Sequence, residues 1–138
     1  MKNKITDKEK KRINKIFELF KKEYPNTKPQ LNYSNPFELL IATILSAQCT
    51  DARVNIVTKE LFKKYKKPID YVNTPAKELE KEIFSTGFYK QKTKSIKECS
   101  SKLFKEYNSK VPKDFNLLTQ LPGVGRKTAS VVAGHAFN

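Results

Sequence analysis

The chain has 138 residues, of which 28 are lysine or arginine and 14 are aspartate or glutamate, so its formal charge is +14 at pH 7. This length is enough for one domain with a core, and so large a positive charge favours a polyanionic partner. No apolar run approaches the roughly 18 residues that span a bilayer, and the charged first residues lack the apolar segment of a signal peptide. These features argue against a membrane-spanning or secreted protein, and we expect an intracellular location, in the cytoplasm or nucleoid.

Neither the charge nor the cysteine content identifies the partner by itself. DNA, RNA and an anionic membrane surface would each attract this charge, and part of the lysine excess fits the Lys-, Asn- and Ile-rich composition of an AT-rich genome. Cys49 and Cys99 lie far apart, with no second cysteine at metal-ligand spacing beside either, and His135 is the only histidine. We therefore expect two reduced cysteines, buried or half-buried, and no metal site.

The N-terminal part of the chain predicts one amphipathic helix. Asp7 can cap a helix that runs to about Glu23. Apolar residues recur on one face of this helix at helical spacing; they are Ile13, Ile16, Phe17 and Phe20. Residues 24–36, which contain three prolines and three asparagines, then form an irregular connector.

A buried helix is predicted at about 36–48. Pro36 suits its first turn, and either Ser34 or Asn35 can cap it. Its residues are apolar nearly all round, which is typical of a helix at the centre of a bundle. The apolar residues are Phe37, Leu39, Leu40, Ile41, Ile44 and Leu45.

Two more helices are expected before residue 87. The pair Thr50-Asp51 can cap a helix that runs to about residue 65. Its inward residues are Val54, Val57, Leu61 and Phe62. A capping-box pattern displaced by one residue opens a short helix at Thr74-Pro75, and Gly87 ends that segment.

The remaining residues also read as helical. A long helix is predicted over 89–107, with lysines outward and Ile96, Cys99, Leu103 and Phe104 inward. Pro112-Lys113-Asp114 starts a short helix at 115–120, and a last helix begins at about 126. No segment alternates apolar and polar residues as a strand would. The sequence therefore predicts an all-α fold, a bundle of orthogonal helices.

The most informative stretch is 121–127, which reads Leu-Pro-Gly-Val-Gly-Arg-Lys. Gly123 and Gly125 permit positive φ and let phosphate oxygens approach the backbone without a Cβ in the way. The turn leads into a helix whose first N–H groups lack partners and suit an anion, and Arg126 and Lys127 add positive charge. This pattern predicts a helix-hairpin-helix that binds a nucleic-acid backbone; the alternative is a plain corner between two helices.

Within this hairpin, the residues have separate expected roles. The side chains of Leu121 and Val124 fasten the turn to the core. We expect the DNA-binding atoms to come from Gly123, Val124, Gly125 and Arg126.

Three segments resemble the endonuclease III family of DNA glycosylases, in the family's order. Residues 121–129, Leu-Pro-Gly-Val-Gly-Arg-Lys-Thr-Ala, resemble its helix-hairpin-helix, and residues 35–51 are similar to its central helix and pocket loop. Residues 86–89, Thr-Gly-Phe-Tyr, followed by Lys92, are similar to its turn before the long helix. The resemblance implies a monomeric base-excision repair enzyme that removes oxidised pyrimidines from double-stranded DNA and cuts at abasic sites.

Lys127 is the predicted nucleophile. A lyase needs an amine that attacks C1′ of the sugar, forms a Schiff base and allows β-elimination of the 3′ phosphate. At the start of a helix, the positive end of the dipole and the neighbouring Arg126 both disfavour a protonated Lys127. The resemblance places Lys127 at the position of the family's catalytic lysine. From the residues alone, the alternative is one more lysine that contacts phosphate.

Two further residues are expected to enter the duplex. An enzyme that acts on a base flips it out, and other groups fill the gap. By resemblance, Gln48 fills the space opposite the orphaned base, and Phe88 occupies a wedge position that is often leucine in relatives. The ordinary alternatives are a helix C-terminal residue for Gln48 and a core aromatic for Phe88. Ser46 and Thr50 are further candidates, as hydroxyls of a base pocket.

The resemblance also implies parts that the 138 residues do not contain. The family has a catalytic aspartate in a Val-Asp-Thr-His segment after the hairpin and four cysteines that hold a 4Fe-4S cluster; Asp51 and Asp114 do not match that aspartate. We therefore expect a C-terminally truncated member with no cofactor of its own, impaired base removal and surviving lyase chemistry. The expected domains are 1–28, a helix and connector that would pack on the missing part, and 29–138, the glycosylase domain with its hairpin at 115–137.

Two other interpretations stay open at this point. One is a non-catalytic helix-hairpin-helix module that binds DNA and does no chemistry. The other is a relative of the adenine-type mismatch glycosylases, which Lys127 disfavours because it fits the lyase branch. Replacing Lys127 would separate a lyase from a binding module, since only the lyase would lose strand cleavage.

Overall fold

The computed structural model describes residues 8–12 and 30–137. The chain forms two compact units, Met1–Gln30 and Leu31–Asn138. In the first unit, residues 8–12 are helical. The apolar face predicted there, formed by Ile13, Ile16, Phe17 and Phe20, lies outside the described residues.

The second unit is built from helices only. Its elements are α2 (Pro36–Leu45), α3 (Asp51–Lys64), α4 (Pro68–Asn73), α5 (Ala76–Ile83), the 3-10 turn η1 (Phe84–Thr86), α6 (Tyr89–Glu106), α7 (Phe115–Thr119) and α8 (Arg126–His135). No strand occurs within 8–12 or 30–137, and the predicted all-α fold is confirmed. No helix in the described part of the chain is long and apolar enough to cross a bilayer.

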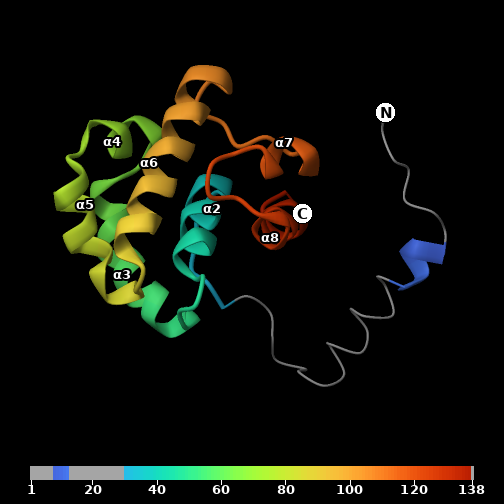
Figure 1. The fold of residues 1–138 in the computed structure, drawn as a ribbon, viewed down its shortest axis with the longest axis horizontal. Helices are drawn as coiled ribbons and strands as arrows, with labels where there is room; N and C mark the ends of the chain where they lie inside the picture. Colours follow the sequence, from blue (N-terminus) through green and yellow to red (C-terminus); the bar gives the residue numbers. More distant parts are fainter. Residues whose placement is uncertain (1–7, 13–29, 138) are drawn as a thin grey trace. The chain divides into compact units, whose positions relative to one another are not determined.

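The central element is α2, which packs against α3, α6 and α8 (Figure 1). Its residues from Phe37 to Leu45 are buried apart from Glu38, as the apolar composition predicts. Asn35 is the cap, because its side chain accepts a hydrogen bond from the Glu38 backbone N–H at 2.9 Å. The helix ends three residues earlier than expected, so Gln48 lies in a turn outside it.

Two local predictions between residues 65 and 76 are wrong. The helix α4 was not expected; it begins at Pro68, and its Asp70 carboxylate accepts hydrogen bonds from the Lys66 and Lys67 backbone N–H groups. The predicted capping box at Thr74 does not form. Its hydroxyl instead donates to the Asp70 carbonyl at 2.8 Å, closing α4 behind it. Pro75 precedes α5 without any side-chain cap.

The long helix α6 also departs from the expected division into apolar and basic faces. Ile96, Cys99 and Leu103 are fully buried as predicted, but the Phe104 side chain is 47% exposed. Leu103 occupies the inward direction at that turn, and the next residue points about 100° away from it. The lysines are not all outward either, because Lys92 is buried on the inner face.

Candidate nucleic-acid interface

The predicted hairpin consists of α7, the turn 120–125 and α8 (Figure 1). The Asp114 carboxylate caps α7 by accepting from the backbone N–H groups of Asn116 and Leu117, at 2.7 and 3.3 Å. Within the turn, the Val124 backbone N–H donates to the Leu121 carbonyl at 3.1 Å, and both side chains are buried. The buried side chains of Leu121 and Val124 therefore anchor the turn to the core, while its two glycines remain exposed.

The two glycines of this turn serve different purposes. Gly123 has φ of +76°, and a Cβ placed there would lie 2.8 Å from the Ser95 hydroxyl and closer still to the Ser95 Cβ, so no side chain fits between the turn and α6. Gly125 has an ordinary extended φ of −87° and open space within 4 Å of its Cβ position. Gly123 shapes the turn, and Gly125 leaves its outer side open.

The N-terminus of α8 carries the exposed positive charge of the hairpin. Gly125 is the N-cap residue and has no side chain with which to cap the helix. Arg126 and Lys127 occupy the first turn, and both are exposed. Uncapped backbone N–H groups, the positive end of the helix dipole and two cations therefore occur together in one helical turn, an arrangement that attracts anions. Val124 can contribute only backbone atoms here, because its side chain is buried.

Gln48 lies in the turn between α2 and α3, and its backbone is left-handed, with φ of +51°. Its side chain is exposed, which leaves it free to contact a ligand and is equally compatible with an ordinary residue that follows a helix C-terminus. The neighbouring hydroxyls are engaged within the protein. Ser46 donates to the Thr43 carbonyl at 2.7 Å, and Thr50 caps α3 by accepting from the Arg53 N–H at 3.2 Å. The cap is thus Thr50, with Asp51 as the first helical residue.

Phe88 has the same unusual backbone, with φ of +48°, and its side chain is 63% exposed. This exposure rules out the alternative of a core aromatic. Phe88 follows Gly87, whose φ is +79°, and precedes α6. Close to it in the sequence, the rings of Phe84 and Tyr89 are in contact, with centroids 4.8 Å apart. Left-handed, exposed, non-glycine residues cost conformational energy and often mark functional sites.

Lys92 is the residue of this region whose role the sequence analysis missed. Its Nζ donates to the carbonyls of Leu45 and Thr86, both at 2.8 Å, and only 5% of the residue is exposed. Burial lowers the pKa of Lys92, and the nearby Cys49 thiol acts weakly in the opposite direction. The sequence offers one small signal, because Lys92 is one helical turn from the inward residue Ile96 and so lies near the inner face of α6. It gives no sign of the carbonyl acceptors, which come from other parts of the chain.

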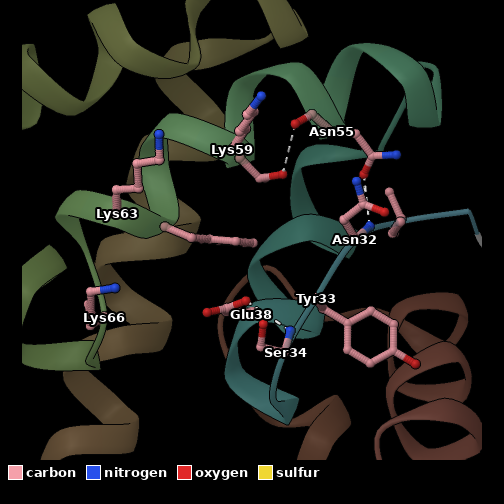
Figure 2. A pocket seen from close by; sticks show the side chains of 11 residues that line it. Asn32, Tyr33, Ser34, Glu38, Asn55, Lys59, Lys63 and Lys66 are labelled. Atoms are coloured by element: carbon pink, nitrogen blue, oxygen red, sulfur yellow. Dashed lines mark hydrogen bonds between the residues drawn. The ribbon is translucent and has the colours of Figure 1, made fainter.

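A separate hollow of about 540 Å³ lies between the 31–34 segment and α3 (Figure 2). Its walls are tied by two hydrogen bonds, from the Ser34 N–H to Glu38 at 2.9 Å and from the Asn32 N–H to Asn55 at 2.8 Å. Lysines from α3 and the segment after it line one side. None of the predicted DNA-contacting residues lines this hollow, so it is not the site that the motifs predict.

The chain's cysteines do not fit an iron–sulfur cluster of the family's kind. Such a cluster needs four thiolates, and this chain has two cysteines. Cys99 is buried in the core, where burial raises the pKa of its thiol to about 12. Among the described residues, no three His, Cys, Asp or Glu side chains come together as metal ligands would.

Known proteins are similar to this chain over most of its length. The sequence model of the HhH-GPD superfamily of base excision DNA repair proteins matches residues 41–137. Endonuclease III of Bacillus subtilis (strain 168) is 50% identical over 125 residues, which cover 91% of this chain and 55% of that protein.

Two solved structures of endonuclease III with DNA have the same fold. A non-covalent complex matches with a TM-score of 0.81, and a trapped covalent intermediate, the estranged-adenine complex, matches with a TM-score of 0.82. Each is 49% identical, and the match covers 93% of this chain and 60% of the other. The chain thus spans little more than half the length of these relatives.

Proposed function

Because the chain belongs to the HhH-GPD superfamily of base excision DNA repair proteins, we propose that it acts on damaged double-stranded DNA with the chemistry of endonuclease III. The substrates are duplexes with abasic sites or oxidised pyrimidines. The observation that carries this proposal is the position of Lys127, which is exposed in the first turn of α8 directly after the hairpin turn. A related endonuclease III has been trapped as a covalent intermediate with DNA, which supports a nucleophile that bonds to the DNA.

In the proposed reaction, the neutral Nζ of Lys127 adds to C1′ of the ring-opened abasic sugar, and loss of water gives an iminium ion. A solvent water molecule then takes a proton from C2′, the electrons of that bond form the C2′–C3′ double bond, and the bond from C3′ to its oxygen breaks. The 3′ phosphate departs with the bonding electrons, and the strand is nicked. Hydrolysis of the remaining imine by water returns the free amine.

The hairpin is proposed to hold the strand while this happens. Phosphate oxygens can approach Gly125, where no side chain is present and the surrounding space is open. Backbone N–H groups at Gly123, Val124 and Gly125 would bind the phosphate, and Arg126 would add a charge contact. These contacts read the backbone and not the bases, so they support binding without selecting a sequence.

Gln48 and Phe88 are proposed to occupy the space that the flipped nucleotide leaves. Both side chains are exposed on left-handed residues, Gln48 in the turn between α2 and α3 and Phe88 directly before α6. An exposed aromatic ring such as Phe88 can stack on a base as well as separate two of them. Gln48 carries an amide that can hydrogen-bond the unpaired base opposite.

The 138-residue chain is expected to cut preformed abasic sites better than it removes bases. Base removal in the family depends on an aspartate for which these residues offer no counterpart. Asp114 caps α7, and Asp51 lies in the first turn of α3. Attack at an abasic site needs only the amine and a bound strand, which Lys127 and the hairpin supply.

Borohydride trapping on a duplex with one abasic site tests the proposal. Reduction of the imine should give a covalent protein–DNA adduct with the wild-type chain. Lys127→Gln should give no adduct and keep most of the DNA affinity, because one of many cations is lost. Lys105→Gln, which removes an exposed lysine from the last turn of α6, is the matched control and should form the adduct normally.

Two outcomes would contradict the lyase. An adduct of undiminished yield with Lys127→Gln would assign the nucleophile to another amine. Tight binding by the wild-type chain with no adduct would instead identify a non-catalytic DNA-binding module.

A further inference from the structure

One buried ammonium group connects the two loops that carry Gln48 and Phe88. We propose that Lys92 is a positioning residue, which fixes the two loops against each other so that Gln48 and Phe88 enter the duplex together. This inference rests on the proposed function, because it assigns a cause to the arrangement of two residues in that same site. It concerns Lys92 acting through Gln48 and Phe88, and not contact of Lys92 with DNA.

The hydrogen bonds of Lys92 place the loops. Its Nζ lies 2.8 Å from both the Leu45 and the Thr86 carbonyl oxygen, so these two oxygens cannot be further apart than twice that distance. Leu45 is the last residue of α2, and Gln48 follows three positions later. Thr86 is the last residue of η1, and Phe88 follows two positions later.

The backbone of Lys92 adds a third connection to the same region. Its N–H donates to the Phe88 carbonyl at 3.0 Å, which starts the hydrogen-bond ladder of α6 directly behind the left-handed residue. Backbone and side chain of one residue therefore hold Phe88 and the end of α2 at once. Because both loops are hydrogen-bonded to Lys92, neither can shift relative to the other without breaking one of these bonds.

A lysine is needed here because the carbonyls that it meets are buried helix ends. Leu45 and Thr86 are 0% and 2% exposed. The last carbonyls of a helix lack partners within that helix, and a buried carbonyl without a donor is costly. An apolar side chain of similar length would fill the space but leave both oxygens unsatisfied. An ammonium group supplies up to three donors from one point.

The same helix provides a matched control. Lys97 is the second lysine of α6 whose Nζ donates to backbone carbonyls, those of Tyr71 at 2.8 Å, Val72 at 3.1 Å and Thr74. It closes the C-terminal end of α4, which carries none of the residues proposed to contact DNA. Removing either ammonium group removes hydrogen bonds to backbone carbonyls, but of the two lysines only Lys92 bonds to the segments that precede Gln48 and Phe88.

The experiment compares Lys92→Met with Lys97→Met on two duplexes, one intact and one with a stable tetrahydrofuran abasic site beside a fluorescent adenine analogue. In Lys92→Met, the ratio of affinities for the abasic and the intact duplex should fall about tenfold, as expected for the loss of hydrogen bonds from a charged group. The rise in fluorescence that reports unstacking of the adenine analogue should also be mostly lost. Lys97→Met should keep both within about twofold. In a chain that already carries Gln48→Ala and Phe88→Ala, adding Lys92→Met should change neither readout further.

The positioning role would be overturned if Lys92→Met and Lys97→Met lost the preference for the abasic duplex equally. It would also be overturned if Lys92→Met had its full effect in the chain that already carries Gln48→Ala and Phe88→Ala. A wild-type chain with no preference for the abasic duplex would instead reject the proposed function, and the inference with it. If Lys92→Met does not fold, nitrogen-15 NMR of the wild-type lysine ammonium groups decides the matter. Adding the abasic duplex should shift the Lys92 signal and leave that of Lys97 in place; equal shifts would overturn the proposal.

Discussion

The hairpin turn at 121–125 and the paired loops at 46–48 and 87–88 acquire their shapes in different ways. The hairpin turn is closed by a hydrogen bond between residues three apart, and its one left-handed residue is Gly123. The paired loops have left-handed residues with full side chains, and they depend on Lys92, whose Nζ reaches a carbonyl 47 positions away in the sequence. The hairpin turn is therefore closed by its own backbone and then packs on Ser95 of α6, whereas the paired loops are joined by a side chain from a distant part of the sequence.

The largest expected effect is in the hairpin turn, where Gly123 has a positive φ and lies against Ser95. Gly123→Ala should lower the free energy of unfolding by about 2–4 kcal/mol, because the new Cβ meets Ser95 and the residue must keep a positive φ. Urea denaturation followed by circular dichroism measures this change. DNA affinity should fall as well, since the turn loses its shape.

Gly125→Ala is the control within the same turn. Its φ is ordinary and the space around it is open, so stability should stay within about 0.5 kcal/mol of the wild type. Affinity for DNA should still fall by about fivefold, the loss of roughly one hydrogen bond to phosphate. Equal destabilisation by the two substitutions would show that Gly123 does not set the turn.

A smaller effect of opposite sign is expected in the paired loops. Phe88→Gly should raise the free energy of unfolding by about 0.5–1 kcal/mol, because glycine adopts the left-handed backbone without strain. It should also weaken the preference for abasic DNA, because the exposed ring is gone. Urea denaturation and competition binding measure the two changes.

Ser109→Gly is the control that separates the relief of backbone strain from the loss of a DNA contact. Ser109 is also left-handed, with φ of +62°, and it follows α6 at a distance in sequence from the proposed contacts. This substitution should stabilise the chain by a similar amount and leave DNA binding unchanged. Loss of stability in both variants would mean that the left-handed torsions carry no strain.

The smallest expected effect is a dependence on pH. Burial lowers the pKa of Lys92 below its ordinary 10.5, so between the two values the folded chain binds fewer protons than the unfolded chain. The contribution of this group to the free energy of unfolding therefore rises with pH across that window. Wild type should gain stability relative to Lys92→Met as the pH approaches 10.5, in urea titrations at several pH values. Parallel curves for the two chains would contradict this.

What the sequence predicted well had local causes. Pro36 and its cap, the apolar composition of α2 and the glycine pattern at 121–127 each depend on neighbouring residues, and the structure places these elements within a few residues of the prediction. The helix α4 was missed because six residues are too few to show a helical period, although a proline stands at its start.

What the sequence did not predict depends on distant contacts. Lysine is usually a surface residue, so nothing near Lys92 or Lys97 indicates that each finds backbone carbonyls inside the fold. The left-handed torsions of Gln48 and Phe88 were equally hidden, since neither residue type favours them. Phe104 was misplaced for a simpler reason: Leu103 occupies the inward direction at that turn of α6, and Phe104 points about 100° away from it.

Hydrogen bonds of Lys92 within the chain hold the backbone beside Gln48 and Phe88. If these two residues enter the duplex as proposed, the backbone entropy of ordering them is lost during folding and need not be lost again on binding. Such a pair would meet every duplex in the same conformation, so the discrimination between damaged and intact duplexes would depend on how readily each duplex deforms around it. Lesions that stack weakly make the duplex easier to deform, so a rigid pair of residues would favour damaged over intact DNA.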